Sequence, residues 1–160
     1  MRQIRFLEAK SGLSTRCVLL SDKAPRSAEF LWQLAAGRPE FEAIHAIWTG
    51  PELSCPLPAS VLPAPLAESA IPEENATSFP DPGDVVLASI PAGSNKALPP
   101  GNFFDVGLFY APGGRLLMPF GWIKANVCGR VVAEDFELFQ ACMKTIRRSG
   151  ACKLQLERVQ

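Results

Sequence analysis

Proline and glycine interrupt this chain so often that regular structure has to be confined to short segments. The 160 residues include fifteen prolines and twelve glycines, which concentrate at residues 51–82 and 91–121. Proline can neither donate to a strand ladder nor continue a helix, and glycine favours turns. The pattern therefore predicts short strands between long ordered loops, with few helices.

Seven or eight segments between these breaks have the alternation or the short apolar run of a β-strand. The segment at residues 41–48 is apolar on both sides, which is typical of a central strand, and Gly113-Gly114 predicts a hairpin between two of the others. The proline-rich stretch at residues 55–72 is expected to be an ordered loop packed on the body. Strands are expected at residues 2–8, 17–20, 41–48, 85–90, 103–110, 115–118, 126–133 and 152–157.

Two segments have helical spacing. The first begins at Pro25, which a helix tolerates in its first turn, and ends before Gly37. The second runs from about Glu134 to Ser149, with acidic residues at its start and basic residues at its end, as the helix dipole favours. Many short strands with only two helices do not form βαβ units. They favour one mainly β domain over residues 1–160, a closed antiparallel barrel with helices at its ends.

Charge and residue usage exclude several classes of function. Sixteen basic residues balance sixteen acidic ones, so the chain lacks the charge that attracts a nucleic-acid backbone or an anionic membrane. No apolar run reaches the roughly 18 residues of a membrane span, and residues 1–10 lack the apolar core of a signal peptide. We therefore expect a cytoplasmic protein without a nucleic-acid or membrane partner.

The five cysteines are scattered singly, and the sequence has one histidine. Neither a disulfide framework nor the ligand spacing of a metal site is visible. We expect reduced cysteines in the core, no metal and no cofactor.

Two segments resemble cyclophilins. Asp-Lys-Ala-Pro-Arg-Ser-Ala-Glu-Phe at residues 22–30 is similar to the signature of that family's first helix. Asn-Val-Cys-Gly-Arg-Val-Val at residues 126–132 is similar to its late Phe-Gly-Lys-Val-Val strand. The isomerase strand of cyclophilins reads Phe-His-Arg, whereas this chain has Ile44, His45 and Ala46, and Gly50-Pro51-Glu52 replaces a Gln-Gly-Gly run. The resemblance therefore implies the fold without the isomerase's catalytic arginine.

A closer resemblance covers almost the whole chain. It is to a bacterial family of unknown function within the cyclophilin-like superfamily, and it rests on three segments. The first has the pattern His-x-x-Trp-x-Gly-Pro-Glu, the second runs from Glu-Asn-x-Thr to Pro-x-Pro-Gly-Asp, and the third is a late Phe-Gly. They are residues 45–52, 74–84 and 120–121. The resemblance implies a cyclophilin-like closed barrel of about eight strands with two helices, and no known reaction.

Three residues are candidates for acid–base chemistry. His45 suits a general acid or base because the ordinary pKa of histidine lies near neutrality, but the more usual interpretation is a core or pocket histidine hydrogen-bonded to the backbone. Glu52 follows a strand end beside Trp48, where it either reaches a pocket or caps a turn. Glu74 either belongs to a solvated loop or folds back to share the pocket of Glu52, in which case two carboxyl groups would push their pKa values apart.

Further candidates would line the pocket. Asn75 and Thr77 accompany Glu74, and Arg115 would hold a ligand carboxylate if it were not an exposed strand-end residue. The aromatic residues are mainly expected in the core, with one or two of them lining an apolar pocket. The aromatic candidates for the pocket are Trp48, Tyr110 and Phe120.

Three hypotheses for function follow. The first is that the barrel face binds a small metabolite, because no nucleophile–base pair can be named. The second is an enzyme with His45, Glu52 or Glu74 as general acid or base on a small polar substrate. The third, a peptidyl-prolyl isomerase or a peptide-binding module, is disfavoured by Ala46. A homodimer formed through barrel edges is a further expectation.

Overall fold

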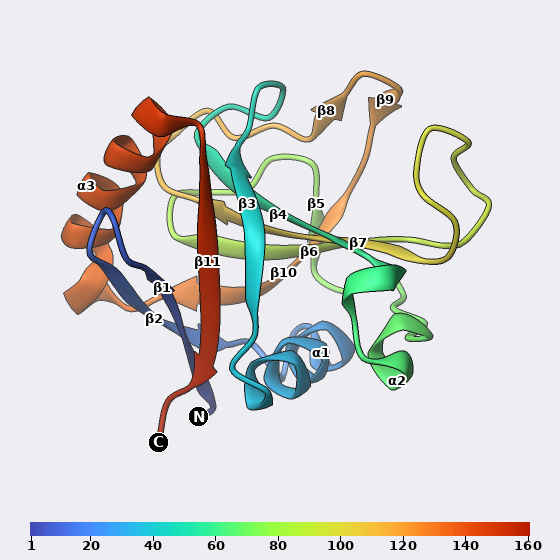
Figure 1. The fold of residues 1–160 in the computed structure, drawn as a ribbon, viewed down its shortest axis with the longest axis horizontal. Coiled ribbons are helices and arrows are strands. Elements are labelled where there is room, and N and C mark those ends of the chain that lie inside the picture. Colours follow the sequence, from blue (N-terminus) through green and yellow to red (C-terminus); the bar gives the residue numbers. More distant parts are fainter.

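Eight antiparallel strands close into a barrel in the computed structural model, which describes residues 1–160. The strand order is β2-β1-β11-β3-β4-β7-β6-β10, and β10 pairs back with β2 to close the ring (Figure 1). This confirms the predicted mainly β architecture. The barrel strands are β1 (Gln3–Glu8), β2 (Leu13–Leu19), β3 (Glu40–His45), β4 (Glu52–Pro58), β6 (Asp84–Ile90), β7 (Phe103–Phe109), β10 (Ala125–Val131) and β11 (Ala151–Arg158).

Two long helices, α1 (Pro25–Ala36) and α3 (Ala133–Ser149), lie at different sides of the barrel (Figure 1). Their positions agree with the predicted helices, and a four-residue helix, α2 (Ala64–Ala67), is additional. A 3₁₀ turn (Ala59–Val61) precedes α2. None of these helices has the length and apolar character needed to cross a bilayer.

The barrel strands bury side chains on both faces. One face of each strand joins the helices in a core cluster of 32 buried residues, in which Leu53, Phe104 and Leu108 are fully buried. A second cluster, of six buried residues, lies on the outer side of β6, β7 and β10. It includes Val86, Phe109 and Leu116.

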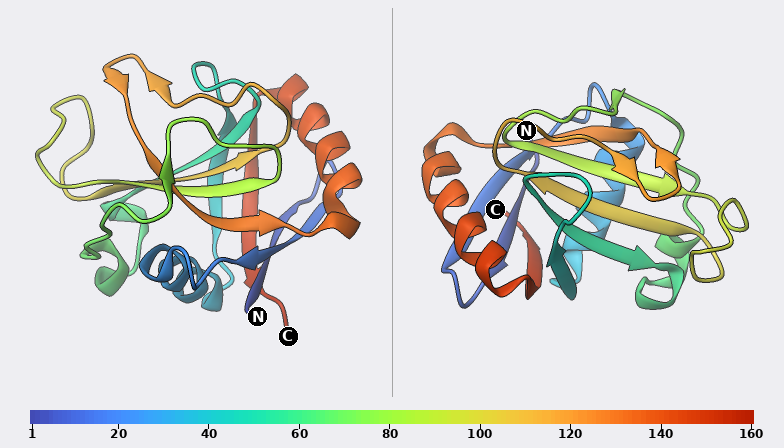
Figure 2. Two further views of the ribbon diagram at one scale, coloured as in Figure 1. Left: turned by 180° about the vertical axis from the view of Figure 1, so that it is seen from behind. Right: turned by 90° about the horizontal axis from the view of Figure 1, so that it is seen from above.

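The outer cluster is covered by residues 111–124. This segment contains a small hairpin of β8 (Leu117–Met118) and β9 (Gly121–Trp122), and Figure 2 shows it outside the barrel. The predicted hairpin between residues 103–110 and 115–118 is therefore wrong. β7 is paired on both sides by β4 and β6, and the N–H of Arg115 instead donates to the Thr49 carbonyl at 3.1 Å.

The proline-rich stretch was also predicted wrongly in part, because it begins with β4. This strand pairs with β7 along its whole length. Its pairing with β3 covers only Ser54 and Leu53, so Pro56 and Pro58 lie where a missing N–H interrupts no ladder with β3. The strand expected at residues 41–48 ends at His45, and a loop carries the chain to β4.

Glu74 holds the start of α1 from a distant part of the sequence. The residue before this helix, Ala24, offers no side-chain cap. Instead, the Glu74 carboxylate accepts hydrogen bonds from the N–H groups of Ser27 at 2.8 Å and Arg26 at 3.3 Å. The buried Asn126 side chain of β10 accepts a bond from the Glu74 N–H at 3.0 Å and donates to Ser27 Oγ at 3.0 Å. Helix, loop and barrel are thereby joined.

This arrangement predicts that Glu74→Ala lowers the free energy of unfolding by about 1 kcal/mol, because two N–H groups at the positive end of a helix lose their acceptor. The measurement is urea denaturation followed by far-UV circular dichroism. The neighbouring Glu73 is exposed and makes no side-chain bond, so Glu73→Ala is the matched control and should stay within about 0.5 kcal/mol of the wild type. Equal losses in the two variants would contradict the capping role.

Candidate functional site

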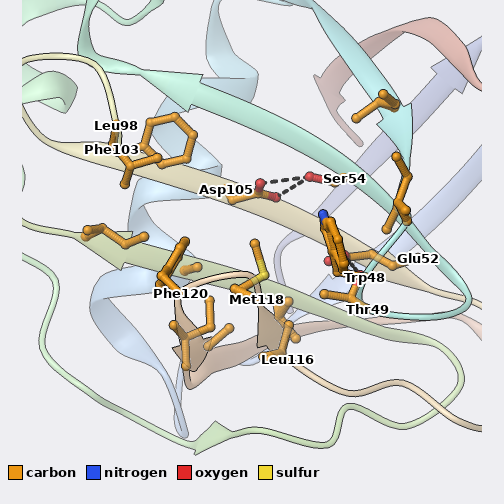
Figure 3. A pocket seen from close by; sticks show the side chains of 18 of the residues that line it. Trp48, Thr49, Glu52, Ser54, Leu98, Phe103, Asp105, Leu116, Met118 and Phe120 are labelled. Carbon is orange, nitrogen blue, oxygen red and sulfur yellow. Dashed lines mark hydrogen bonds between the residues drawn. The ribbon is translucent and has the colours of Figure 1, made fainter. Parts of the chain in front are cut away.

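A pocket of about 290 Å³ opens on the outer face of the barrel (Figure 3). Its floor is formed by the outward-facing residues of β4, β6 and β7, because successive side chains of a strand point to opposite faces. Its walls come from the loop between β3 and β4 and from residues 116–123. Fourteen of the nineteen lining residues are hydrophobic.

Small side chains in register with one another make this part of the barrel face concave. Ser54 of β4 lies opposite Gly107 of β7, and Ala88 of β6 lies opposite Asp105. A Cβ at Gly107 would overlap with Glu52 Oε2, so a larger residue there would displace this carboxyl group. The space that a side chain would occupy on β7 is therefore taken by the carboxyl group of Glu52.

Two carboxyl groups and two hydroxyl groups form the polar part of the pocket. Glu52 is only 5% exposed, and Thr49 Oγ1 donates to its Oε1 at 2.5 Å. Ser54 Oγ lies 2.9 and 2.8 Å from the two carboxylate oxygens of Asp105. Glu52 Oε2 accepts no hydrogen bond from the protein, and no side-chain oxygen of the protein is sealed away without a partner. Oε2 is therefore open to the cavity.

The two carboxyl groups affect each other's protonation. Burial raises the pKa of Glu52 well above its ordinary value, and the negative charge of Asp105 raises it further. Burial also raises the pKa of Asp105, against the opposing effect of the Ser54 hydroxyl. Two carboxyl groups coupled in this way lose their protons as a pair. The pair therefore retains a proton in a pH range where exposed carboxyl groups are fully ionised.

His45 lies at the edge of the pocket with both ring nitrogens occupied. Nδ1 is 3.0 Å from the Ala46 carbonyl oxygen, so it carries the proton and donates it. Nε2 is then the acceptor for the Tyr110 hydroxyl, at 2.7 Å. Burial lowers the pKa of His45, which favours the neutral ring. This geometry agrees with the structural interpretation of His45 and leaves it no free nitrogen for a substrate.

The aromatic candidates separate into two groups. Trp48 and Phe120 line the pocket and are 56% and 49% exposed, which places them at its rim rather than in the core (Figure 3). Tyr110 is buried and lies behind the pocket, where its hydroxyl binds His45 and its carbonyl accepts a bond from Gln140 at 2.8 Å. The pocket thus has a partly exposed aromatic rim above a polar floor.

Four predicted site residues lie away from the pocket. Glu74 caps α1, and Asn75 Nδ2 donates to the Val127 carbonyl at 2.9 Å. Thr77 is opposite Ala125 in the short strand β5 (Ala76–Thr77). The Arg115 guanidinium donates to the Gly113 carbonyl at 3.1 Å and is not among the lining residues. The structure therefore does not bring these side chains to Glu52.

Sequence reasoning missed three polar residues of the pocket, which are Thr49, Ser54 and Asp105. Asp105 had a recognisable signal, because it is the one charged residue in the otherwise apolar run at residues 103–110 and alternates with the core residues Phe104 and Val106. Ser54 has none, because the prolines on either side of it predict no strand at the position of β4.

No arginine or lysine lines the pocket. Ala46 stands where the resemblance to cyclophilins places the catalytic arginine. No arginine from another part of the chain lines the pocket in its place. The structure also contains no group of three or more His, Cys, Asp or Glu side chains with the arrangement of a metal site.

Solved structures share the fold at low sequence identity. The structure of McbB in complex with tryptophan has a TM-score of 0.67 and 15% identity, over 96% of this chain and 44% of that one. This chain thus spans less than half of the McbB chain. A cyclophilin-type peptidyl-prolyl cis-trans isomerase from Cryptosporidium parvum, solved in the presence of the dipeptide Ala-Pro, has a TM-score of 0.51 and 13% identity over 99% of both chains. The fold is therefore cyclophilin-like, as predicted.

Comparison with proteins of curated function gives no match. A family model described as a protein of unknown function, DUF3830, matches residues 7–158. This confirms the expected membership of a family of unknown function with a cyclophilin-like fold. The match extends over nearly all of the chain, and the chain therefore belongs to the DUF3830 family.

Proposed function

We propose that this domain binds a small, mainly apolar metabolite in the outer-face pocket, with one polar group of the ligand placed against Glu52 and Asp105. Ligand sites are typically concave and apolar, with a few polar groups that fix the orientation of the ligand. The pocket has this composition, and its cavity is at the small end of the usual range. Its size favours a ligand of one ring or a short chain over a long peptide.

The observation that carries this proposal is the environment of Glu52 Oε2. The side chain is nearly buried, yet this oxygen faces the cavity without a protein donor. Because Oε2 is accessible from the cavity, solvent or a ligand has to supply its hydrogen-bond partner. A donor group on a ligand would satisfy it, and the apolar walls would exclude water from the resulting hydrogen bond.

A second candidate function is acid–base catalysis by the same two carboxyl groups. It is favoured by their coupled protonation, because one group can donate a proton while the other accepts one. Asp105 replaces Glu74 as the partner of Glu52 in this hypothesis, and His45 has no part in it. An isomerase function has no support in the pocket, which offers no cationic group for a proline carbonyl.

The binding proposal predicts a ligand-dependent thermal shift that requires Trp48. In a screen of amines, amino acids including tryptophan, carboxylic acids, sugars, nucleotides and short proline peptides, a ligand at about 100 times its Kd should add about 2.7 kcal/mol, which is several degrees for a chain of this length. Trp48→Ala should reduce the shift, because it removes one wall of the pocket. The measurement is differential scanning fluorimetry of both proteins.

Trp122→Ala is the matched control for this screen. Trp122 is 56% exposed, like Trp48, but it packs on Phe79 and does not line the pocket. A hit that is lost equally in both variants would place the ligand elsewhere. A screen without any hit would count against small-molecule binding altogether.

The state of the two carboxyl groups predicts a pH dependence of stability. A carboxyl whose pKa is raised by folding stabilises the native state below its unfolded pKa, and this contribution is lost as the pH rises towards the folded pKa. Between about pH 5 and about pH 8, the free energy of unfolding of the wild type should therefore fall relative to that of Glu52→Gln, by on the order of 2 kcal/mol. The measurement is urea denaturation at several pH values.

The control here is Glu137→Gln, which makes the same chemical change on an exposed position of α3. Its profile should run parallel to that of the wild type. Parallel profiles for the wild type and Glu52→Gln would show that Glu52 ionises normally in the folded protein.

A further inference from the structure

We propose that the ligand group held against Glu52 and Asp105 is a cationic nitrogen, so that the pocket takes small organic amines with an apolar body and rejects neutral and anionic analogues. This inference rests on the proposed binding function and names its ligand class. It starts from the two carboxyl groups that share one small cavity without a compensating positive charge.

The charged and titratable groups around the pair come from every element of the pocket. His45 at the end of β3 is bonded at both nitrogens and neutral. The outward residues of β6 in the lining are aliphatic. Segment 111–124 carries Arg115, whose guanidinium is bonded to the Gly113 carbonyl, and Lys124, which is exposed. Lys96, in the loop that contributes Leu98 to the lining, is exposed. No lysine or arginine lines the pocket, so the pair has no cation of its own.

Hydrogen-bond polarity on the floor also favours a donor. Thr49 and Ser54 are the two hydroxyl residues of the lining, and each directs its proton to a carboxyl oxygen (Figure 3). When both carboxyl groups are ionised, the floor therefore presents only acceptors to the cavity. Glu52 Oε2 is the acceptor without a protein partner, and an ammonium has three donors to offer.

The rest of the lining favours an organic cation over a metal ion. A calcium ion takes six to eight oxygen ligands, and magnesium retains several waters. This pocket supplies two carboxyl groups among mainly apolar residues, and Trp48, Phe103 and Phe120 add aromatic rings. Aromatic faces attract organic cations, and they also bury an apolar body next to the charged group.

Binding of an amine should be coupled to proton release. A cation favours the ionised form of both carboxyl groups, so the proton that they retain passes to the buffer when the ammonium enters. Affinity should therefore increase as the pH rises from about 6 to about 9. It should decrease again near pH 10, where a simple alkylamine loses its own proton.

The test uses three probes that share a phenylethyl-type skeleton, which are 2-phenylethylamine, 2-phenylethanol and phenylacetate. Binding is measured by titration calorimetry on the full chain and by the fluorescence of Trp48, with Trp48→Phe to assign the signal. At pH 8 the amine should bind at least tenfold more tightly than the alcohol, since a hydrogen bond to a charged group typically contributes 1.5–3 kcal/mol. Titrations in phosphate and in Tris should give different heats, in proportion to the protons released.

Glu52→Gln and Asp105→Asn should each reduce the preference for the amine by tenfold or more and reduce the proton release. Affinity for the alcohol should stay within about threefold, which shows that the pocket is still formed. Glu137→Gln should behave as the wild type. Magnesium and calcium chloride at millimolar concentration should not displace the amine.

Each contrary result has a distinct meaning. If the alcohol or phenylacetate binds as tightly as the amine, or if the preference for the amine survives Glu52→Gln, the cationic ligand class is wrong while the binding function stands. Displacement of the amine by magnesium or calcium would make the pair a metal site. If neither these probes nor any compound of the wider screen affects Trp48 or the thermal stability, the binding function itself fails.

Discussion

Glu52 lies beneath the outer face of β7 because Gly107 has no side chain to occupy that space. The register of β4 against β7 places Gly107 opposite Ser54, with Asp105 two residues further along the same face. Any larger residue at position 107 would collide with the carboxyl group. The position of the Glu52 carboxyl group, next to Asp105 and with Oε2 open to the cavity, depends on the absence of a side chain at Gly107.

The cost of this arrangement is offset within the pocket. Burying a carboxylate is unfavourable unless it is hydrogen-bonded or protonated. Thr49 donates one hydrogen bond to Glu52, and the single proton of the Ser54 hydroxyl is directed to the carboxyl oxygens of Asp105. Partial protonation removes part of the remaining charge. A ligand that brings a donor or a positive charge would therefore bind the Glu52 carboxyl group, whose Oε2 has no donor from the protein.

Much of the fold could be predicted from local patterns, and much of the site could not. Alternating apolar residues and two amphipathic stretches predict a barrel with α1 and α3. They do not predict β4, because Pro56 and Pro58 normally exclude a strand and are tolerated here only where β4 does not pair with β3. Glu52, Trp48 and Phe120, which the sequence predicts near one pocket, line the same cavity. Glu74 does not line it, because its partners are the N–H groups of a helix nearly fifty residues away, a separation that no local pattern encodes.

Successive residues of β4, β6 and β7 face opposite sides of the barrel wall, so substitutions along one strand have two different effects. Residues such as Leu53, Leu87 and Phe104 face the barrel core, and their immediate neighbours Ser54, Ala88 and Phe103 face the pocket. Substitutions at one set change the packing that keeps the chain folded, and those at the other change what the outer face can accommodate. Relatives could thus diverge in ligand preference at every second position of these strands while inheriting the same barrel.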